Sequence, residues 1–158
     1  MKRPLNALVA VCALSLAGCH GTHHESDTGV TAWPFVGGSL RNTRDAVTES
    51  AIGPATVERL RQSWTIRLDG TAASNPVSDG ADIFISTSGG HLYRIQRETG
   101  HVVWDLVLEK TTGLPGAASK GIALSGRAGV VGLQNKPYVV ALDKDAGALL
   151  WKTRLGEH

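Results

Sequence analysis

Alternating apolar and polar positions recur along most of the chain and predict short β-strands. Three segments share one pattern, a Trp followed four residues later by a Leu: 64–68, 104–108 and 151–155. Because alternate residues of a strand face the same side, we expect each Trp to be buried together with its Leu. Only residues 52–61 have the apolar spacing of a short helix, with Pro54 near the first turn, where a missing N–H costs little.

These strands are organised as a tandem repeat. Residues 94–104 align without a gap on residues 141–151, 47 positions later. Gly-containing turns divide each unit, about 74–108 and about 121–155, into about four strands. Four strands in a unit of roughly 40 to 50 residues is typical of a β-propeller blade. A small sandwich or barrel also uses many short strands, but it gives no reason for an ungapped repeat.

The sequence therefore predicts an all-β fold, an incomplete β-propeller of about two four-stranded blades. The hydrophobic fraction of 42% and the 19 Gly residues agree with a turn-rich globular protein.

The first residues have the features of a secretory signal. Lys2 and Arg3 precede an apolar stretch, 5–16, that is too short to span a membrane as a stable helix. Leu-Ala-Gly then stands directly before Cys19, which resembles the bacterial lipoprotein signal. The resemblance implies removal of residues 1–18, a diacylglycerol on Cys19 and attachment to a membrane. A soluble secreted protein with an unmodified Cys is the alternative.

The segment after the signal, residues 19–32, is polar, lacks apolar periodicity and is expected to be a flexible tether. Cys12 leaves with the signal, so the mature chain is expected to have no disulfide and no Cys metal site. Without Lys2 and Arg3 the formal net charge falls from +2 to 0, which gives no indication of a nucleic-acid partner.

The repeated stretch resembles the tryptophan-docking motif of quinoprotein propellers: Ala, any residue, Asp, two of any, Thr, Gly, three of any, Trp. The matching residues are Thr99, Gly100 and Trp104 in the first copy, and Ala141, Asp143, Gly147 and Trp151 in the second. Arg94 and Gln96 replace Ala and Asp in the first copy, and Ala146 replaces Thr in the second. We expect the Gly to close a turn, and Trp64, Trp104 and Trp151 to cover a neighbouring blade, burying on the order of 150–250 Å² each.

Other segments resemble dehydrogenases that depend on pyrroloquinoline quinone (PQQ). Trp33-Pro34, Gly37-Gly38 and 42–44 are similar to the opening segment of the PQQ-dependent alcohol dehydrogenases, and 111–152 is similar to the polyvinyl-alcohol-dehydrogenase-like branch. The resemblance covers about 33–158. It implies a quinone near the propeller axis, a Ca²⁺ ion on a quinone oxygen and a carboxylate that acts as base.

One stretch of the chain corresponds to a cofactor contact of that family. Where the dehydrogenases often have a vicinal Cys pair followed by Arg, this chain has Ala118, Ser119 and Lys120. The resemblance implies that Ser119 and Lys120 bind the cofactor, since a cation near a quinone oxygen stabilises developing negative charge. A solvated loop lysine is the alternative.

The sequence offers no candidate catalytic base and no Ca²⁺ ligand set. Asp143 and Asp145 fall in a repeat turn, where Asp is a common turn former. His91 and His101 are expected at a strand surface rather than on a metal.

Two units are fewer than the roughly four to eight blades of a closed propeller, and an array of fewer than three repeats buries little core. We therefore expect a truncated gene product or one piece of a split propeller, with the remaining blades from another chain or another copy. Two functions stay open. One is the amino-terminal part of a PQQ-dependent, alcohol-oxidising dehydrogenase, inactive alone. The other is a propeller scaffold that resembles the lipid-anchored lipoprotein of the outer-membrane barrel-assembly machine. His20 after Cys19 favours the outer membrane.

Overall fold

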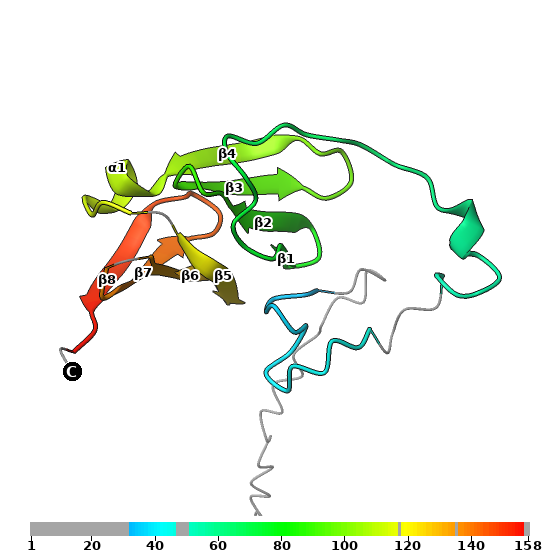
Figure 1. Ribbon diagram of the computed structural model, residues 1–158, viewed down its shortest axis with the longest axis horizontal. Coiled ribbons are helices and arrows are strands. Elements are labelled where there is room, and N and C mark those ends of the chain that lie inside the picture. The colour runs from blue at the N-terminus through cyan, green and yellow to red at the C-terminus, as the bar shows by residue number, and fades with distance from the viewer. Residues whose placement is uncertain (1–31, 47–50, 117, 135, 157–158) are drawn as a thin grey trace, which may run out of the picture.

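A computed structural model describes residues 32–46, 51–116, 118–134 and 136–156, and in this part of the chain two four-stranded antiparallel sheets lie side by side (Figure 1). The first sheet contains β1 (Val77–Ser78), β2 (Asp82–Ser86), β3 (His91–Gln96) and β4 (Val102–Val107). The second contains β5 (Ala118–Ser125), β6 (Ala128–Leu133), β7 (Tyr138–Asp143) and β8 (Leu149–Arg154). Strand order follows chain order in both sheets. The predicted all-β fold with two four-stranded blades is confirmed.

The outer hairpins of the two sheets have the same register. Arg94 pairs with Trp104 in the first sheet, and Ala141 pairs with Trp151 in the second, each beside an irregularity in the ladder. The turns that precede the outer strands contain Gly100 with φ +72° and Gly147 with φ +70°. A residue with a Cβ is disfavoured at such angles, which explains why Gly occupies both positions.

The inner strands depart from the repeat of 47 residues. Ile85 of β2 pairs with Tyr93 of β3, whereas Val140, 47 residues after Tyr93, pairs with Val131, only 46 residues after Ile85. The connection between β6 and β7 is therefore one residue longer than that between β2 and β3. Because a slip of one residue moves every side chain of a strand to the other face, Val131 corresponds to Ile85, 46 residues earlier, and not to Phe84, 47 residues earlier.

The hydrophobic core lies between the two sheets. It contains Val77, Phe84 and Leu92 from the first sheet and Val131, Val140 and Leu142 among others from the second. Each of these side chains has at most 2% of its surface exposed. A buried aliphatic or aromatic side chain of this size contributes roughly 1.5–3 kcal/mol, so contact between the sheets dominates the stability of this part of the chain.

The segment around Trp33 joins the two sheets at their innermost strands. Trp33 exchanges two backbone hydrogen bonds with Ser78 of β1, of 2.7 and 2.8 Å, and the carbonyl of Pro34 accepts the amide of Leu124 in β5 at 3.0 Å. The segment that contains Trp33 therefore contacts both sheets.

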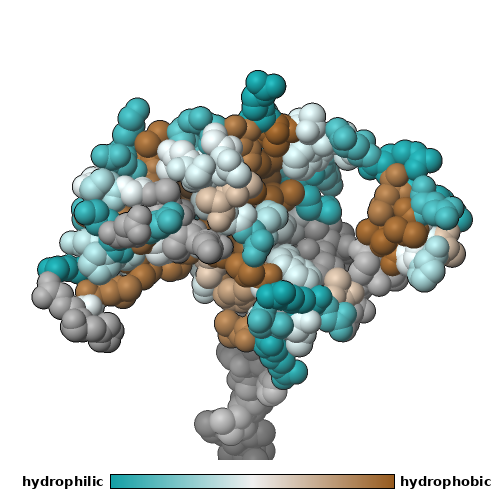
Figure 2. Space-filling view, in the orientation of Figure 1, coloured by the Kyte–Doolittle hydropathy of each residue, from teal (hydrophilic) through white to brown (hydrophobic). Residues whose placement is uncertain are grey.

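The helices differ from expectation. Residues 52–61 contain only a 3₁₀ turn, η1 (Val57–Arg59), and no residue of this turn is buried. Figure 2 shows the apolar residues of this region as a brown patch on a segment that projects from the sheets (Figure 1). A short helix is only marginally stable unless its apolar side packs against the rest of the protein. A short helix that was not predicted, α1 (Leu108–Thr112), follows β4 and ends at Gly113 in the left-handed region. None of the helices in the described ranges has the length and apolar character needed to cross a bilayer.

Candidate functional site

Two indole side chains join a strand segment to the sheet that follows it in the chain. Trp64 Nε1 donates to the carbonyl of Arg97 at 2.8 Å, and Trp104 Nε1 donates to the carbonyl of Lys144 at 3.2 Å. Arg97 and Lys144 are 47 residues apart, so both acceptors occupy the same place in the repeat. The ring of Trp104 also packs against Phe84, with 6.0 Å between the ring centroids. The packing role predicted for Trp64 and Trp104 is confirmed.

The Gly of each turn allows a side chain of the preceding unit to approach the backbone, Trp64 at Gly100 and Leu106 at Gly147. A Cβ on Gly100 would lie 2.7 Å from Cδ2 of Trp64, and a Cβ on Gly147 would lie 3.1 Å from the side chain of Leu106. A distance of 2.7 Å to a ring carbon is a steric clash. Gly100 is therefore required by the turn and also by the indole that lies on it.

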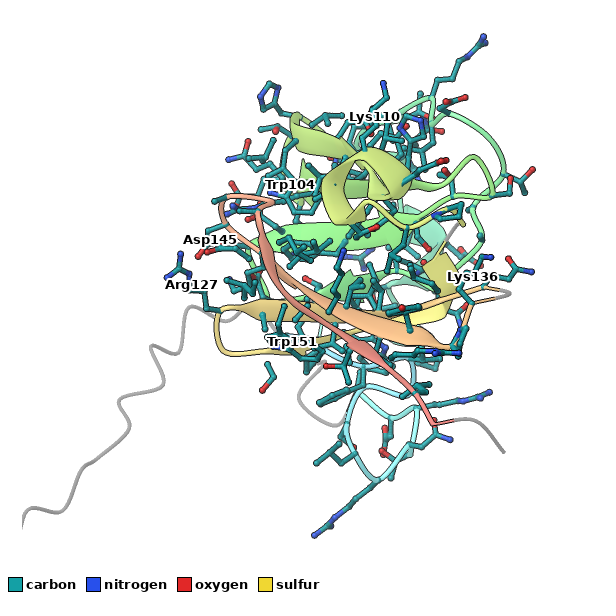
Figure 3. The ribbon with its side chains drawn as sticks, turned by 90° about the vertical axis from the view of Figure 1, so that its left-hand side faces the viewer. Trp104, Lys110, Arg127, Lys136, Asp145 and Trp151 are labelled. Carbon is teal, nitrogen blue, oxygen red and sulfur yellow. The ribbon has the colours of Figure 1, made fainter. Side chains whose placement is uncertain are left out.

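Trp151 is in the equivalent position of β8, but no sheet among the described residues lies in front of it. Its side chain is 46% exposed, and its indole makes no hydrogen bond to any described residue. Leu155 is 51% exposed, whereas its counterpart Leu108 is fully buried. Figure 3 views the molecule from this side, with Trp151 on β8 in front of the second sheet. The prediction that all three Trp and Leu pairs are buried was wrong for this third pair in the described part of the chain.

The segment 64–68 was predicted to be a strand, and it belongs to no sheet among the described residues. Trp64, Ile66 and Leu68 are half-buried and the residues between them are exposed, which is the alternation of a strand. However, none of its backbone groups makes a backbone hydrogen bond within the described ranges. The strand pattern is present, and what is missing is a neighbouring strand to pair with.

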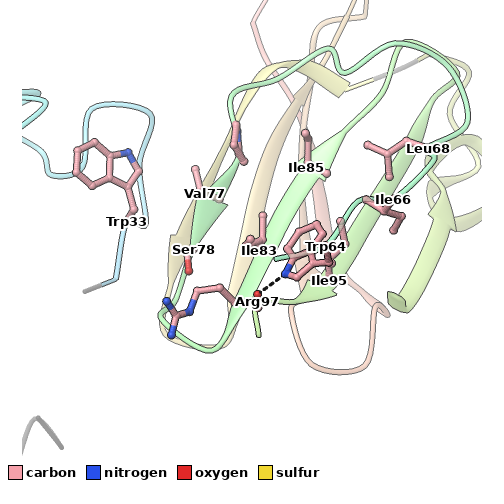
Figure 4. Close-up of a pocket in the computed structure, with 11 residues that line it drawn as sticks. Trp33, Trp64, Ile66, Leu68, Val77, Ser78, Ile83, Ile85, Ile95 and Arg97 are labelled. Carbon is pink, nitrogen blue, oxygen red and sulfur yellow. Dashed lines mark hydrogen bonds between the residues drawn. The ribbon is translucent and has the colours of Figure 1, made fainter. Parts of the chain in front are cut away.

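An apolar groove of about 540 Å³ lies beside this segment, on the face of the first sheet that points away from the second (Figure 4). Trp33 lies at one side of the groove and Trp64 at the other, while Ile83 and Ile85 of β2 form its floor. Their counterparts in the second sheet are covered by the first sheet, as Val131 at 1% exposure shows. The groove exists because no described residue covers this face. Sequence reasoning missed it, although alternating isoleucines in β2 are a signal of a face that is meant to be buried.

A cluster of charged side chains links the two sheets at the edge where Figure 3 shows Arg127 and Asp145. Lys144 Nζ lies 2.6 Å from Asp79 of the first sheet, and Arg94 of the first sheet donates to the carbonyl of Asp145 at 2.9 Å. Arg94 also forms an ion pair with the carboxylate of Asp145 across the sheets, at 3.3 Å. The other ion pairs of the cluster lie within one unit: Arg94 with Asp82, Arg127 with Asp143, and Lys144 with Asp145. These charges are used for contact between or within the sheets.

The pKa values of this cluster favour its charged forms. Burial alone would raise the pKa of Asp79, but the hydrogen bond from Lys144 and the amides of Asp82 and Ala81 outweigh it and lower the pKa. Burial alone would likewise lower the pKa of Lys144, and the nearby carboxylate of Asp79 outweighs this effect and raises it.

The buried turn carboxylate of Asp143 is stabilised in its charged form by the local backbone. The amide of Ala146 donates to the carboxylate at 3.0 Å and, with the amide of Asp145 and the side chain of Arg127, lowers the pKa of Asp143. Asp143 and Asp145 thus lie in the repeat turn, as the sequence predicts, and Asp143 organises it.

Acid is expected to weaken the contact between the sheets. The folded-state pKa of Asp79 lies below its ordinary value of 3.8, so its stabilising effect is complete above that value and is lost as the pH falls through the folded pKa. Lys144 behaves in the opposite sense: its effect is complete below 10.5 and is lost as the pH rises through its raised pKa. Urea unfolding from about pH 6 to about pH 3 should show a smaller loss of stability for Asp79→Asn than for the unmodified protein. Glu58→Gln, on the exposed 3₁₀ turn, serves as the control, and equal acid sensitivity of Asp79→Asn and the unmodified protein would contradict the assignment.

His91 is less exposed than the sequence suggested. Its Nδ1 lies 2.6 Å from Asp105 and its Nε2 lies 3.0 Å from Asp69, its ring stacks on Tyr93, and its side chain is 17% exposed. His91 thus lies on a strand, as expected, and its ring is held between the exposed carboxylates of Asp69 and Asp105. Within the described residues no group of three or more His, Cys, Asp or Glu side chains is suited to a metal ion. This part of the chain does not form a site for the Ca²⁺ ion that the resemblance implies.

The residues predicted to bind the cofactor lie on the innermost strand of the second sheet. Ser119 and Lys120 belong to β5, next to the segment of Trp33 and Pro34, and their side chains are not among those described. Cys19, the signal 1–18 and nearly all of the predicted tether also lie outside the described residues. Their roles stay predictions, and the structure does not test the predicted domain limits.

Comparison with known proteins finds structural similarity to two groups, the alcohol and methanol dehydrogenases and BamB. The chain resembles the solved quinohemoprotein alcohol dehydrogenase from Comamonas testosteroni, with 25% identity, a TM-score of 0.65, and 78% of this chain and 19% of that chain covered. A europium-containing methanol dehydrogenase gives 18% identity, a TM-score of 0.65 and coverage of 80% and 23%. BamB from Moraxella catarrhalis gives 21% identity, a TM-score of 0.50 and coverage of 58% and 27%.

The chain thus spans about a fifth to a quarter of the length of these proteins. The two likenesses below 25% identity support the fold alone. A comparison with curated protein sequences gave no match. The family described as outer membrane protein assembly factor BamB, a family of PQQ-type repeats, matches residues 56–158, which include both sheets and the repeated turns. The chain therefore belongs to this family of propeller-forming repeats.

Proposed function

We propose that this chain is a propeller-type binding scaffold of the bacterial envelope that takes part in outer membrane protein assembly. The observation that carries the proposal is the uncovered face of the second sheet, where the docking side chain Trp151 is 46% exposed. Exposed apolar patches of this kind mark interaction sites in soluble domains. The family match supports the same function, and the cross-sheet charges Asp79 and Lys144 are already engaged in holding the sheets together.

Affinity purification of the tagged chain from envelope extracts tests the scaffold. We expect a protein of the outer-membrane assembly machinery to co-purify, and Trp151→Ala to reduce its yield by about tenfold, since buried Trp side chains are frequent hot spots of interfaces. Leu40→Ala is the matched control, because Leu40 is 88% exposed and lies outside both sheets. Absence of any outer-membrane assembly protein, or equal yields from Trp151→Ala and Leu40→Ala, would contradict the scaffold.

A second function, part of a PQQ-dependent alcohol dehydrogenase, is favoured by the 25% identity to the quinohemoprotein enzyme over most of this chain. Bound PQQ would supply the redox chemistry, and Lys120 would place a positive charge beside it. Titration of the purified chain with PQQ and Ca²⁺, followed by quinone absorbance, distinguishes the two functions. The scaffold predicts no saturable change. A saturable change that Lys120→Ala abolishes and Lys136→Ala preserves would instead establish the dehydrogenase relationship.

The proposal includes a lipid anchor on Cys19 that holds the scaffold at the outer membrane, supported by the sequence around this residue. Fractionation of cells that produce the full chain should find it in the membrane pellet. Cys19→Ser should move it to the soluble fraction, because the acyl chains contribute roughly 0.8 kcal/mol per buried methylene. Cys12→Ser is the control within the signal, and retention of Cys19→Ser in the outer membrane would contradict the anchor.

A further inference from the structure

We propose that His91 is a pH-sensitive latch. Its charged ring holds residues 69–71 against the turn between β2 and β3, and loss of that charge releases Asp69. This inference goes beyond the scaffold function proposed above and does not depend on it. It is supported by two short contacts of one ring, by the unequal exposure of the two carboxylates, and by the chemistry of the other contacts of the segment.

The ring of His91 lies between two carboxylates from different parts of the chain. Its Nδ1 is 2.6 Å from an oxygen of Asp105, in the neighbouring strand β4, and its Nε2 is 3.0 Å from an oxygen of Asp69. A carboxylate can only accept hydrogen bonds, and a neutral imidazole has a single N–H. Both contacts are therefore hydrogen bonds only when the ring is the doubly protonated imidazolium.

The neutral ring keeps one of these two hydrogen bonds. Asp105 makes the shorter contact, and its side chain is 41% exposed, against 70% for Asp69. Water competes less for the less exposed carboxylate, so the remaining proton of His91 stays on Nδ1, toward Asp105. The lone pair of Nε2 then faces the negative oxygen of Asp69, and this repulsion moves Asp69 into solvent.

The other contacts of the segment 69–71 do not titrate near neutral pH. The amide of Asp69 donates to the hydroxyl of Tyr93 at 3.0 Å. The amide of Thr71 donates to Oγ of Ser88 at 3.1 Å, and the amide of Ser88 donates to the carbonyl of Thr71 at 2.8 Å. Amides and aliphatic hydroxyls do not change charge between about pH 5 and about pH 8. Of the contacts that the structure describes for this segment, the one with His91 thus responds to pH in this range.

The surroundings of the ring supply no other switch in the same range. Tyr93, on the same strand, stacks on His91 with 5.8 Å between the ring centroids, and a phenol is neutral at these pH values. Helix α1 begins beside the turn, where its first residue donates to the carbonyl of Gly90 at 2.9 Å. In the described part of the chain, Glu109 and Lys110 of this helix form no ion pair with His91. The two carboxylates therefore determine how the charge of the ring acts on the segment.

The latch controls the order of the chain between Trp64 and Thr71. Residues 64–68 make no backbone hydrogen bond within the described ranges, so this stretch is held by the indole of Trp64 at one end and by residues 69–71 at the other. Release of Asp69 weakens the second attachment, and local opening is easiest where few hydrogen bonds hold the backbone. The hold is complete where the imidazole is charged, at low pH, and is lost as the pH rises.

Nitrogen-15 nuclear magnetic resonance of the His91 ring in the full chain tests the latch at its atoms. We expect both ring nitrogens to be protonated at about pH 5.5, and Nδ1 alone at about pH 8, because the hydrogen bond to Asp105 fixes the tautomer. A proton on Nε2 at about pH 8 would mean that Asp105 is released in place of Asp69. That result, or a ring that is doubly protonated at both pH values, would overturn the inference.

Amide exchange measures the release of the segment. The protection of the Thr71 amide, relative to its intrinsic exchange rate at each pH, should fall by roughly threefold to tenfold from about pH 5.5 to about pH 8. His91→Gln should remove this pH dependence, and His101→Gln, at an exposed position, should preserve it. The ion pair between the sheets does not interfere, because the pKa of Asp79 is lowered and that of Lys144 is raised, away from this range.

Substitutions of Asp69 separate the latch from a simple loss of charge. An amide side chain has both an acceptor and a donor, so Asp69→Asn can accept from the imidazolium and donate to the neutral ring. This variant should keep the Thr71 amide protected at both pH values, whereas Asp69→Ala should leave it weakly protected at both. Equal protection of the unmodified chain at the two pH values, or a pH dependence that persists in Asp69→Asn, would overturn the inference.

Discussion

Trp104→Ala is expected to lower the free energy of unfolding by roughly 3 kcal/mol, the lower end of the usual range for removing a large aromatic side chain, because Trp104 is only partly buried. The substitution removes the packing of the ring on Phe84 and the hydrogen bond to the carbonyl of Lys144. It thus acts on the contact between the two sheets, where the core of the described residues lies. Urea unfolding followed by far-ultraviolet circular dichroism measures the effect without relying on Trp fluorescence.

The matched control is the same substitution at the equivalent position of the second sheet. Trp151 is 46% exposed and none of the described sheets lies in front of it, so Trp151→Ala should lower the free energy of unfolding by less than about 1 kcal/mol. A third variant, Trp104→Phe, keeps most of the packing and removes the indole donor. It should lower the free energy of unfolding by about 1 kcal/mol more than Trp151→Phe does. Equal losses for Trp104→Ala and Trp151→Ala would show that the indole does not join the sheets.

Gly100→Ala is expected to be the second most destabilising change, with a loss of about 2–3 kcal/mol. Two effects add up: φ is +72° at this position, and the new Cβ would lie 2.7 Å from the ring of Trp64. The ring must move away, which also breaks its hydrogen bond to Arg97. The near-ultraviolet circular dichroism of the folded variant should change as well, since it reports on the packing of Trp rings.

Gly126→Ala separates the two effects. Gly126 also has a positive φ, of +54°, but no atom lies within 4 Å of its potential Cβ. This variant should therefore pay only for the backbone conformation, about 1 kcal/mol, and leave the near-ultraviolet spectrum unchanged. If Gly126→Ala is as destabilising as Gly100→Ala, backbone conformation alone explains both losses and the contact with Trp64 contributes nothing.

The sequence predicts the parts of this fold that depend on local pattern. The Trp-to-Leu spacing and the Gly turns identify the outer strands, because they combine the period of a strand with a turn that only Gly adopts easily. The same pattern predicts a strand at 64–68, and the alternation of half-buried and exposed residues in this segment agrees with that prediction. Within the part of the chain that the structure describes, this segment pairs with no strand, and a local pattern contains no information about whether a neighbouring strand is present.

The errors in detail have the same physical origin. The repeat of 47 residues holds for the outer strands of the two sheets. The connection between β6 and β7 is one residue longer than that between β2 and β3, so β6 corresponds to β2 with a shift of 46 residues. The composition of the strands does not reveal this difference. The apolar residues of 52–61 have helical spacing, but Ile52, Val57 and Leu60 are each about half exposed, so their burial contributes too little for a full helix and only the turn Val57–Arg59 forms. The helix Leu108–Thr112 is too short to show a period.

The candidate binding faces could be predicted only in part. That an indole covers a neighbouring blade follows from the motif, and the structure confirms it for Trp64 and Trp104. Which indole lacks a neighbour, and which face of β2 is open, depend on the arrangement of whole sheets. The resemblance to PQQ-dependent enzymes directed attention to Ser119 and Lys120, whereas the described side chains direct it to the groove beside Trp64 and to Trp151.

Hydrogen–deuterium exchange of the indole N–H groups of Trp64, Trp104 and Trp151, observed by nuclear magnetic resonance, tests the central claim most directly. The claim is that Trp64 and Trp104 join successive units of the propeller through the same contact, and that Trp151 is the same group without a partner. We predict slow exchange for Trp104, intermediate exchange for Trp64, whose contact is nearer the surface, and fast exchange for Trp151. Exchange of Trp104 as fast as that of Trp151 would contradict the account.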